Sequence, residues 1–300
     1  SATGGDVLGT VGSLGSARLV GDHVLASTQF ATGTASALAV TSFAAGASGT
    51  GLDRSSFTIA DNVTSADASA NRAINAVSVS AGATGNANAG LANSQMSDAV
   101  VTSTAVTDAG YASGTSPALA LQDASISIGG NSTTAVARGN VADNRLTLNG
   151  VTATASPQTP TAQLGRFDTV VSAGATLLNG QSNYGAVSAS AANSSYGVPL
   201  NLGVVPISSS NVGVANNTVS AGAYGNAASN QLNLAAAGRL PTAAVVNVQA
   251  NFGAVTAQVT GATYRVVSGP MTAGSLSIDG NLLTASAVGN QATSVIATPR

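Results

Sequence analysis

Apolar and polar residues alternate in short segments along the whole chain. Ile126 and Ile128 are separated by one polar residue, and Leu232 and Leu234 show the same spacing. A period of two residues is typical of a strand with one buried face. Between such segments lie combinations such as Gly-Gly-Asn and Leu-Asn-Gly, whose residues accept the left-handed backbone of a tight turn. We therefore predict strands of roughly five to eight residues, with a turn about every ten residues.

The alternating segments belong to a longer repeat. Each copy has an alternating stretch, then Gly-Asn, then a short step to another alternating stretch. The copies cover residues 77–93, 131–148, 217–234 and 281–297, and a degenerate copy at 62–79 has Ala70-Asn71 in place of Gly-Asn. We predict that the Gly-Asn pairs form the structural turns of the repeat, at Gly85, Asn86, Gly139, Asn140, Gly225, Asn226, Gly289 and Asn290.

The spacing of these pairs suggests how the strands stack. Their asparagines are separated by 54, 86 and 64 residues, and the last two intervals are near multiples of about 21. A second motif, at 183–189 and 251–257, recurs after 68 residues, close to three times about 23. The interval of 54 fits poorly. We predict an all-β fold with little or no α-helix, namely a β-solenoid (β-helix) with irregular rungs of about 20–23 residues.

Two features divide this predicted solenoid. The segment 156–160 contains two prolines, which lack the backbone donor that a ladder needs, so we interpret it as a Pro-containing linker. Residues 1–55 show only loose alternation and lack Gly-Asn, so we expect an N-terminal cap or assembly segment there. Residues 56–155 and 161–300 would then hold the β-solenoid repeats.

Composition supports a stacked β-fold. Only 7% of the 300 residues are charged, every basic residue is Arg and every acidic residue is Asp. Without Lys and Glu, the chain lacks two strong formers of exposed helices. Like charges stacked at the strand spacing of about 4.8 Å repel each other, whereas Asn, Ser and Thr ladders are neutral and add hydrogen bonds. The net charge is −2 and the arginines are scattered, so we expect no nucleic-acid partner.

Candidate catalytic and metal-binding residues are few. The chain has no Cys and a single His, which excludes thiolate and multi-His metal sites. His23 follows Asp22 directly, and neighbours on a strand face opposite sides, so they cannot pair as in a catalytic triad. The aspartates are dispersed, and the nearest cluster, Asp61, Asn62 and Asp67, is typical of a polar turn. We therefore expect no enzyme activity, no catalytic or metal site and no cofactor. The intervals between the five tyrosines do not repeat, which favours core or turn-flanking positions over a binding ladder.

The Gly-Asn blocks carry a resemblance. With the downstream residues Asn93, Asn144 and Asn230, they resemble the repeat proteins that Gram-negative bacteria export as surface fibres and adhesins. These include curli-type functional amyloid subunits and the holdfast-anchor proteins of stalked bacteria. The resemblance implies export, a β-rich fold and a role in fibres or attachment. Ser1 in place of Met fits a mature chain after removal of a signal peptide, and a boundary within a longer chain would look the same.

The expected function is that of an extracellular, cell-surface structural protein. It would be a subunit or anchor of a fibre used in adhesion or biofilm attachment, with itself, an outer-membrane anchor or a surface polysaccharide as partners. We expect head-to-tail assembly in which the segment 1–55 of one copy packs on the β-surface of the next. The alternatives are a surface- or ice-binding β-solenoid and a polysaccharide-binding, passenger-type β-helix. The Thr-x-Thr pairs, which begin at Thr32, Thr102, Thr152 and Thr159, form no regular ladder of the kind that ice binding needs.

Overall fold

The computed structural model describes residues 5–10, 16–21, 23–47, 52–80, 88–113, 121–150, 161–164, 169–199, 207–235 and 241–298. Every regular element in these ranges is a β-strand. The prediction of an all-β fold is therefore confirmed. No helix among the described residues is long and apolar enough to cross a membrane.

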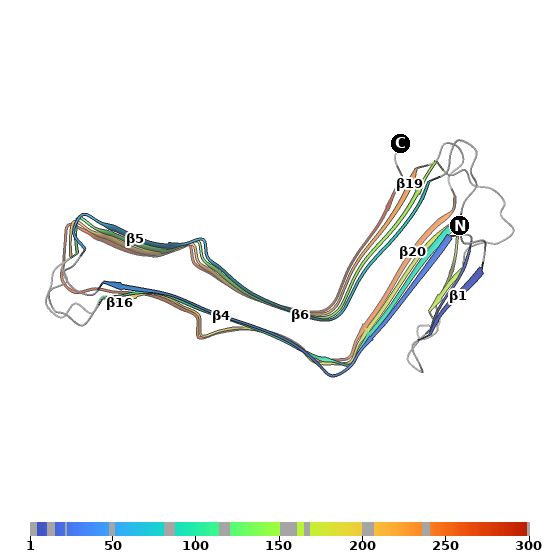
Figure 1. Cartoon of the computed structure of the whole chain (residues 1–300), viewed down its shortest axis with the longest axis horizontal. Helices are drawn as coiled ribbons and strands as arrows, with labels where there is room; N and C mark the ends of the chain where they lie inside the picture. Colours follow the sequence, from blue (N-terminus) through green and yellow to red (C-terminus); the bar gives the residue numbers. More distant parts are fainter. Residues whose placement is uncertain are drawn as a thin grey trace.

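The chain runs out and back four times, and each passage forms one layer of the molecule (Figure 1). The layers span residues 23–80, 89–149, 175–235 and 243–297. We call the first half of a layer its outward arm and the second half its return arm. Both arms are long and bent, so the molecule has a convex and a concave side. We call the end that carries β20 in Figure 1 the near end and the opposite end the far end.

The outward arms form two parallel sheets and a short bridge at the far end of the molecule. The near sheet contains β3 (His23–Ala31), β7 (Ala89–Ser97), β14 (Ala175–Asn183) and β20 (Ala243–Asn251). The next sheet contains β4 (Thr34–Ala47), β8 (Val100–Ser113), β15 (Val187–Ala192), β16 (Ser195–Pro199), β21 (Val255–Thr260) and β22 (Thr263–Val267). The far end is bridged by β9 (Leu121–Gln122), β17 (Ile207–Ser208) and β23 (Met271–Thr272).

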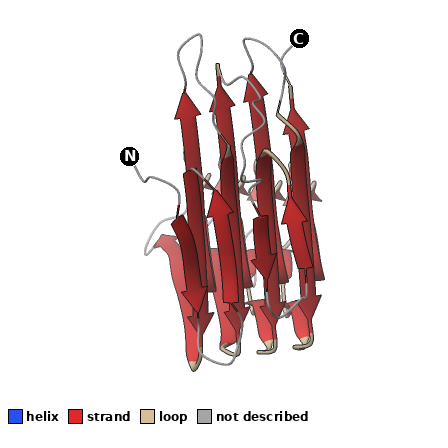
Figure 2. Cartoon of the chain, turned by 90° about the vertical axis from the view of Figure 1, so that its right-hand side faces the viewer, coloured by secondary structure: helices blue, strands red, loops and turns tan. Residues whose placement is uncertain are grey.

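The return arms form two further parallel sheets. The first contains β5 (Ser56–Ala60), β10 (Ser125–Gly129), β18 (Asn211–Ala215) and β24 (Ser275–Asp279). The second contains the long strands β6 (Val63–Ser80), β11 (Ser132–Asn149), β19 (Thr218–Ala235) and β25 (Leu282–Ala297), which lie side by side in Figure 2. In each sheet the four layers follow one another in sequence order.

Strand register identifies the true repeat. Asn71, Asn140, Asn226 and Asn290 pair in one column, at intervals of 69, 86 and 64 residues. The predicted short rung is therefore wrong, because the repeating unit is a whole out-and-back layer. The short period came from dividing the intervals of 86 and 64 residues into multiples of about 21, although each of these intervals is one whole layer.

The predicted Gly-Asn turns are also wrong where the structure describes them. Gly139, Gly225 and Gly289 lie inside β11, β19 and β25, and none of them has a positive φ. Figure 1 shows these long strands bending without a break. Gly85 and Asn86 lie outside the described residues.

The real corner lies at the start of each repeat, between the two sheets of the return arm. The corner residues Asp61, Gly130, Asn216 and Gly280 all have φ between 57° and 70°. Each of them precedes the Asn that opens the next strand segment. Gly and Asx tolerate this left-handed conformation better than other residues, which explains why these two types occupy the column.

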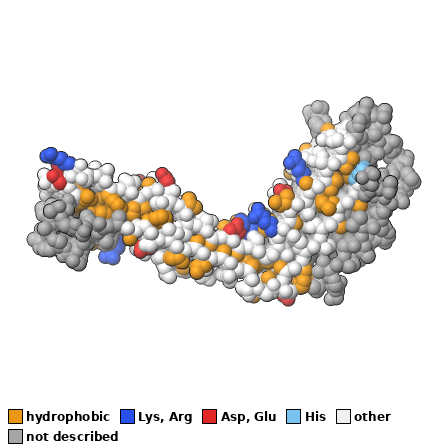
Figure 3. All heavy atoms as spheres, in the orientation of Figure 1, with side chains coloured by type: hydrophobic (Ala, Val, Ile, Leu, Met, Phe, Trp, Pro, Cys, Tyr) orange, Lys and Arg blue, Asp and Glu red, His pale blue; other side chains and the backbone are white. Residues whose placement is uncertain are grey.

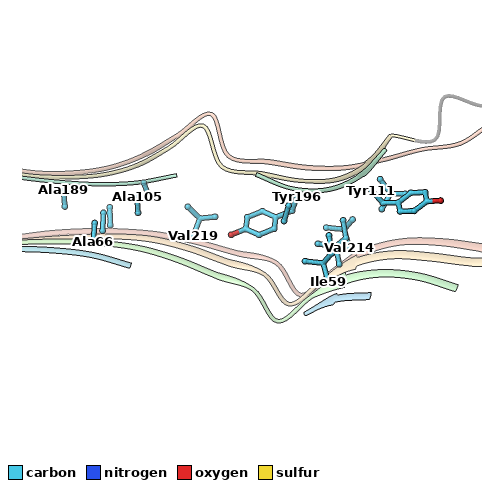
Figure 4. Packing of buried hydrophobic residues seen from close by; sticks show 14 of the residues in the cluster. Ile59, Ala66, Ala105, Tyr111, Ala189, Tyr196, Val214 and Val219 are labelled. Atoms are coloured by element: carbon cyan, nitrogen blue, oxygen red, sulfur yellow. The ribbon is translucent and has the colours of Figure 1, made fainter. Parts of the chain in front are cut away.

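The core lies between the two arms and is narrow. Near the middle of the molecule it is filled by alanines such as Ala66, Ala105 and Ala189, while Tyr196 and Val214 fill a wider region towards the far end (Figure 4). Leucines fill the near end, among them Leu146 and Leu177. A narrow interior explains why small residues dominate a chain in which aromatics make up only 3%.

A fifth element covers part of the outer face. β1 (Gly5–Thr10), β2 (Ser16–Gly21), β12 (Thr161–Leu164) and β13 (Thr169–Ser172) form an antiparallel sheet. This sheet contacts the near sheet of the outward arms, where Val171 packs with Ala92 and Leu178. The near sheet is therefore covered on both faces, and every residue of β14 is buried.

The domain boundaries can be compared with these elements. Residues 23–47 of the predicted N-terminal segment form β3 and β4, which pair in register with β7 and β8. They are thus the outward arm of the first layer, at one end of the stack. Residues 161–164 and 169–172 belong to the antiparallel sheet. The predicted linker 156–160 lies outside the described residues.

Candidate assembly site: amide ladders and open edges

The most distinctive chemistry of the molecule is a set of asparagine ladders that run through the layers. In the first ladder, the Asn71 Nδ2 donates to Asn140 Oδ1 at 2.8 Å, and Asn140 and Asn226 each donate to the next asparagine at 2.7 Å. Asn140 and Asn226 are fully buried. Three of the predicted residues, Asn140, Asn226 and Asn290, are therefore brought together in one column.

The same amides also tie each return arm to an outward arm. The Nδ2 of Asn71 donates to the Met96 carbonyl at 2.7 Å, and that of Asn140 donates to the Ser182 carbonyl at 2.9 Å. Asn226 continues the series by donating to the Ala250 carbonyl at 2.8 Å. In each case the acceptor lies one layer further along the stack. The return arms of the first three layers therefore each sit between two outward arms.

Two further asparagine ladders join the outward and return arms through side-chain hydrogen bonds alone. Asn75 donates to Asn144 at 2.8 Å within the return arms, and Asn93 donates to Asn179 at 2.7 Å within the outward arms. Cross-links join the two ladders, as in the bond from Asn144 Nδ2 to Asn179 Oδ1 at 3.1 Å. The downstream asparagines of the repeat, Asn93, Asn144 and Asn230, all belong to this network.

A glutamine ladder and a corner asparagine ladder complete the set. Gln95, Gln181 and Gln249 each donate to the glutamine of the preceding layer at 2.6–2.7 Å and to a facing backbone carbonyl. At the corner, Asn62, Asn131, Asn217 and Asn281 repeat the pattern with donor–acceptor distances of 2.9–3.0 Å. Each such bond contributes about 1 kcal/mol, and leaving a buried partner unsatisfied costs more.

Two of the predicted glycines, Gly139 and Gly225, leave space for an asparagine side chain and a backbone carbonyl of the next layer. A Cβ atom on Gly139 would lie 2.5 Å from Asn183 Oδ1 and 2.5 Å from the Gly225 carbonyl oxygen. Gly225 is crowded in the same way by Asn251 and Gly289. In the first layer the same column holds Ala70, and the register places Ser97 where the later layers have Asn183 and Asn251. Glycine is therefore needed where a larger amide stands opposite.

Charged groups avoid one another across the layers. Wherever a described strand pair contains a charged residue, its partner in register is uncharged. Figure 3 shows how sparse charged groups are on the face in view. Arg138 of the second layer forms an ion pair with Asp67 of the first layer at 2.6 Å, diagonally across the two adjacent strands. Because both side chains are partly exposed, this ion pair contributes little, about 1 kcal/mol or less.

The other candidate residues lie in different elements of the fold. His23 begins β3 beside Ala89, and Asp22 lies outside the described residues. No group of three or more His, Cys, Asp or Glu side chains that could hold a metal ion is found within the described ranges. Asp61 and Asn62 form the corner of the first layer, where Asn62 joins a ladder.

Aromatic residues stack between the third and fourth layers. Tyr196 and Tyr264 have ring centroids 5.5 Å apart, and Tyr184 and Phe252 have ring centroids 4.8 Å apart. The intervals between tyrosines could not predict the second pair, because one of its partners is a phenylalanine. In both pairs the partners have the same separation along the chain as Asn179 and Asn247, which pair in register in these outward arms.

The stacked tyrosines should make stability sensitive to high pH. Burial, followed by the neighbouring Tyr196, raises the pKa of Tyr264 to about 12. Burial also raises the pKa of Tyr196, against the opposing effect of hydrogen bonds to Thr133 and Thr107. A raised pKa means that the folded state holds its proton more tightly, so this stabilisation is complete below pH 10 and is lost as the pH rises towards 12.

We therefore expect the melting temperature to fall between pH 10 and pH 12. In Tyr264→Phe this fall should be clearly smaller, since the phenylalanine has no proton to lose. Thermal unfolding followed by circular dichroism, together with tyrosinate absorbance, measures both effects. An unchanged fall in the variant would contradict the assignment to Tyr264.

The stack ends in two open edges. Strands β20 to β25 pair on one side only, and so do β3 to β6 at the opposite end. At the fourth layer, Leu283 is 49% exposed, whereas Val219 of the same column is fully buried. Likewise Ile278 is 52% exposed and its partner Val214 is fully buried. The same columns are therefore buried in the third layer and exposed in the fourth.

Comparison with protein families, with curated proteins and with solved structures found no match to this chain.

Proposed function

We propose that this protein is an extracellular structural protein, a subunit or anchor of a cell-surface fibre used in adhesion or biofilm attachment. We also propose that its four layers are coils of a β-solenoid that continues from one copy to the next. The observation that carries this proposal is the pair of open edges at the ends of an in-register parallel stack. An outer-membrane anchor or a surface polysaccharide would be the second partner of such a fibre.

The ladders support a structural role. They bury neutral amides in columns, and amide ladders of this kind stabilise stacked β-assemblies. Unpaired strand edges are sites where another chain adds by backbone hydrogen bonding. Natural monomers blunt such edges with charges, but the described part of the fourth layer carries only Arg265 and Asp279. We propose a structural and not an enzymatic role on these grounds.

Electron microscopy of the purified chain over a range of concentrations tests the proposal. We expect unbranched filaments with a strand spacing of about 4.8 Å along the axis and a subunit repeat of about 19 Å for four layers. A monodisperse monomer at every concentration would contradict the fibre role. If that monomer also showed thermal hysteresis, a surface- or ice-binding role would replace it.

A further inference from the structure

The two open edges differ in shape. In the first layer, the inward side chains of β6 are buried, because β6 lies between β4 and β8. In the fourth layer, β25 contacts the outward arm of its own layer only, and its side chains are almost all exposed. One end therefore presents an uncovered return arm, and the other end presents an uncovered outward arm.

The hydrogen-bonding groups at the two ends are complementary. In the first ladder every amide donates towards the fourth layer, so Asn290 ends the series as a donor without an acceptor among the described residues. At the other end, Asn71 Oδ1 begins the series as an acceptor with no donor there. The glutamine ladder runs in the opposite direction, so it leaves an acceptor on Gln249 and a donor on Gln29.

We infer that the fourth layer of one copy stacks on the first layer of the next, with its return arm set between two outward arms. This inference rests on the proposed function, because it specifies how two subunits of the fibre meet. Within the chain, Asn71, Asn140 and Asn226 donate to carbonyls that share one register column with Phe30. Asn290 then donates to the Phe30 carbonyl and to Asn71 Oδ1 of the neighbouring copy.

Other columns continue across this joint without conflict. The corner column alternates Asp61, Gly130, Asn216 and Gly280, so a following Asp61 beside Gly280 keeps the alternation. A Cβ atom on Gly130 or Gly280 would collide with the Asx side chain of the preceding layer, which shows that the alternation has a steric basis. The joint therefore places glycine and Asx in the same relation as the layers inside the chain.

Charges also permit the joint. In this register Arg265 would meet Ala44, and Asp279 would meet Ala60. No pair of like charges is brought into direct register, as is already the case within the chain. The alternative is a two-fold joint, in which the fourth layers of two copies face each other. That joint is less favourable, because the Asn290 Nδ2 donors of both copies would then face each other with no acceptor between them.

One difference between the layers does not prevent stacking. In the outward arm, the third and fourth layers carry an extra residue between β15 and β16 and between β21 and β22, whereas β4 and β8 are continuous. The joint would set a layer with this bulge against one without it. The second and third layers already make that match inside the chain.

Disulfide trapping tests the register, because the chain contains no cysteine of its own. Ser65 and Thr284 are exposed residues of the same column, in the first and fourth layers. In one copy they are about 14 Å apart across three layer spacings, which is too far for a disulfide. In the proposed joint they are direct neighbours.

A chain with both Ser65→Cys and Thr284→Cys should give a ladder of covalent multimers on oxidation of its filaments. Each single variant should remain a monomer under denaturing electrophoresis. A control with Ser65→Cys and Ser277→Cys should also remain monomeric, because Ser277 would meet Thr58. Dimers that stop at two chains in Thr284→Cys alone would overturn the inference in favour of a two-fold joint.

A second variant tests the hydrogen bond itself. Asn290→Asp places a carboxylate against the Phe30 carbonyl of the neighbour and should raise the concentration needed for filaments at least tenfold. The matched control is Asn149→Asp, which adds the same charge at an exposed residue of the second layer away from the joint. If the chain with Ser65→Cys and Thr284→Cys forms filaments that give no cross-links on oxidation, and Asn290→Asp and Asn149→Asp assemble equally, this joint is overturned but the fibre role stands. The absence of any filaments would instead contradict the fibre role.

Discussion

Asn140→Asp should destabilise the folded chain by about 3 to 5 kcal/mol at neutral pH. The substitution keeps the shape of the side chain and its acceptor for Asn71, but it replaces the amide donor by a carboxylate. That carboxylate would face Asn226 Oδ1 and the Ser182 carbonyl, which now accept bonds of 2.7 and 2.9 Å. Asn226 Oδ1 and the Ser182 carbonyl would each lose a side-chain donor, and the buried charge would keep only the bond from Asn71.

Urea unfolding followed by circular dichroism measures this loss, and Asn149→Asp is the matched control. Asn149 lies in the same strand but is exposed, so its substitution should change stability by less than about 0.5 kcal/mol. Burial should raise the pKa of the new carboxyl above its usual value near 4. The destabilisation should therefore shrink as the pH falls below the raised pKa and approach its minimum near pH 4. Equal losses in both variants would show that the ladder contributes nothing specific.

Gly139→Ala should cost about 2 to 3 kcal/mol, an unusually large effect for adding one methyl group. The added carbon would overlap Asn183 Oδ1 and the Gly225 carbonyl, and backbone atoms of the next layer cannot move aside easily. Gly289→Ala is the matched control from the same column. Its Cβ would have no neighbour closer than 3.6 Å, so we expect almost no change in stability.

The first layer suggests how to rescue the variant. There Ala70 replaces the glycine, and the register places Ser97 opposite in place of Asn183. Adding Asn183→Ser to Gly139→Ala should therefore recover part of the lost stability, which a double-mutant cycle from urea unfolding detects. Strictly additive losses from the two substitutions would contradict the proposed packing.

The repeated asparagines were recognisable from sequence, but their role was not. Asn140, Asn226 and Asn290 share a motif, and they do share a column. The motif indicated a turn because glycine is common at positive φ. At Gly139, however, the glycine is needed for a close approach of chains, and no local pattern separates the two uses. The true corner had a signal of its own, a Gly or Asx immediately before the Asn that opens each repeat, as at Gly130-Asn131 and Asn216-Asn217.

The layer length was hidden for a different reason. Connectors of unequal length separate the layers, so the same column recurs after 69, 86 and then 64 residues. The longest interval contains β12 and β13, which leave the stack to form the antiparallel sheet. A search for a fixed period therefore finds common divisors of these intervals instead of the intervals themselves.

The register also determines when the chain can fold. Matched residues in the parallel ladders are 64 to 87 positions apart, so the backbone ladder of a layer has no partner until a further layer exists. Folding is therefore slow, because the entropy of closing such long loops is lost before any stabilising contact forms. As the chain emerges from a ribosome, residues 23–80 must therefore wait for residues 89–149 before either segment can settle. Roughly the first half of the polypeptide stays unfolded during that interval, and each later segment then joins an edge that is already ordered.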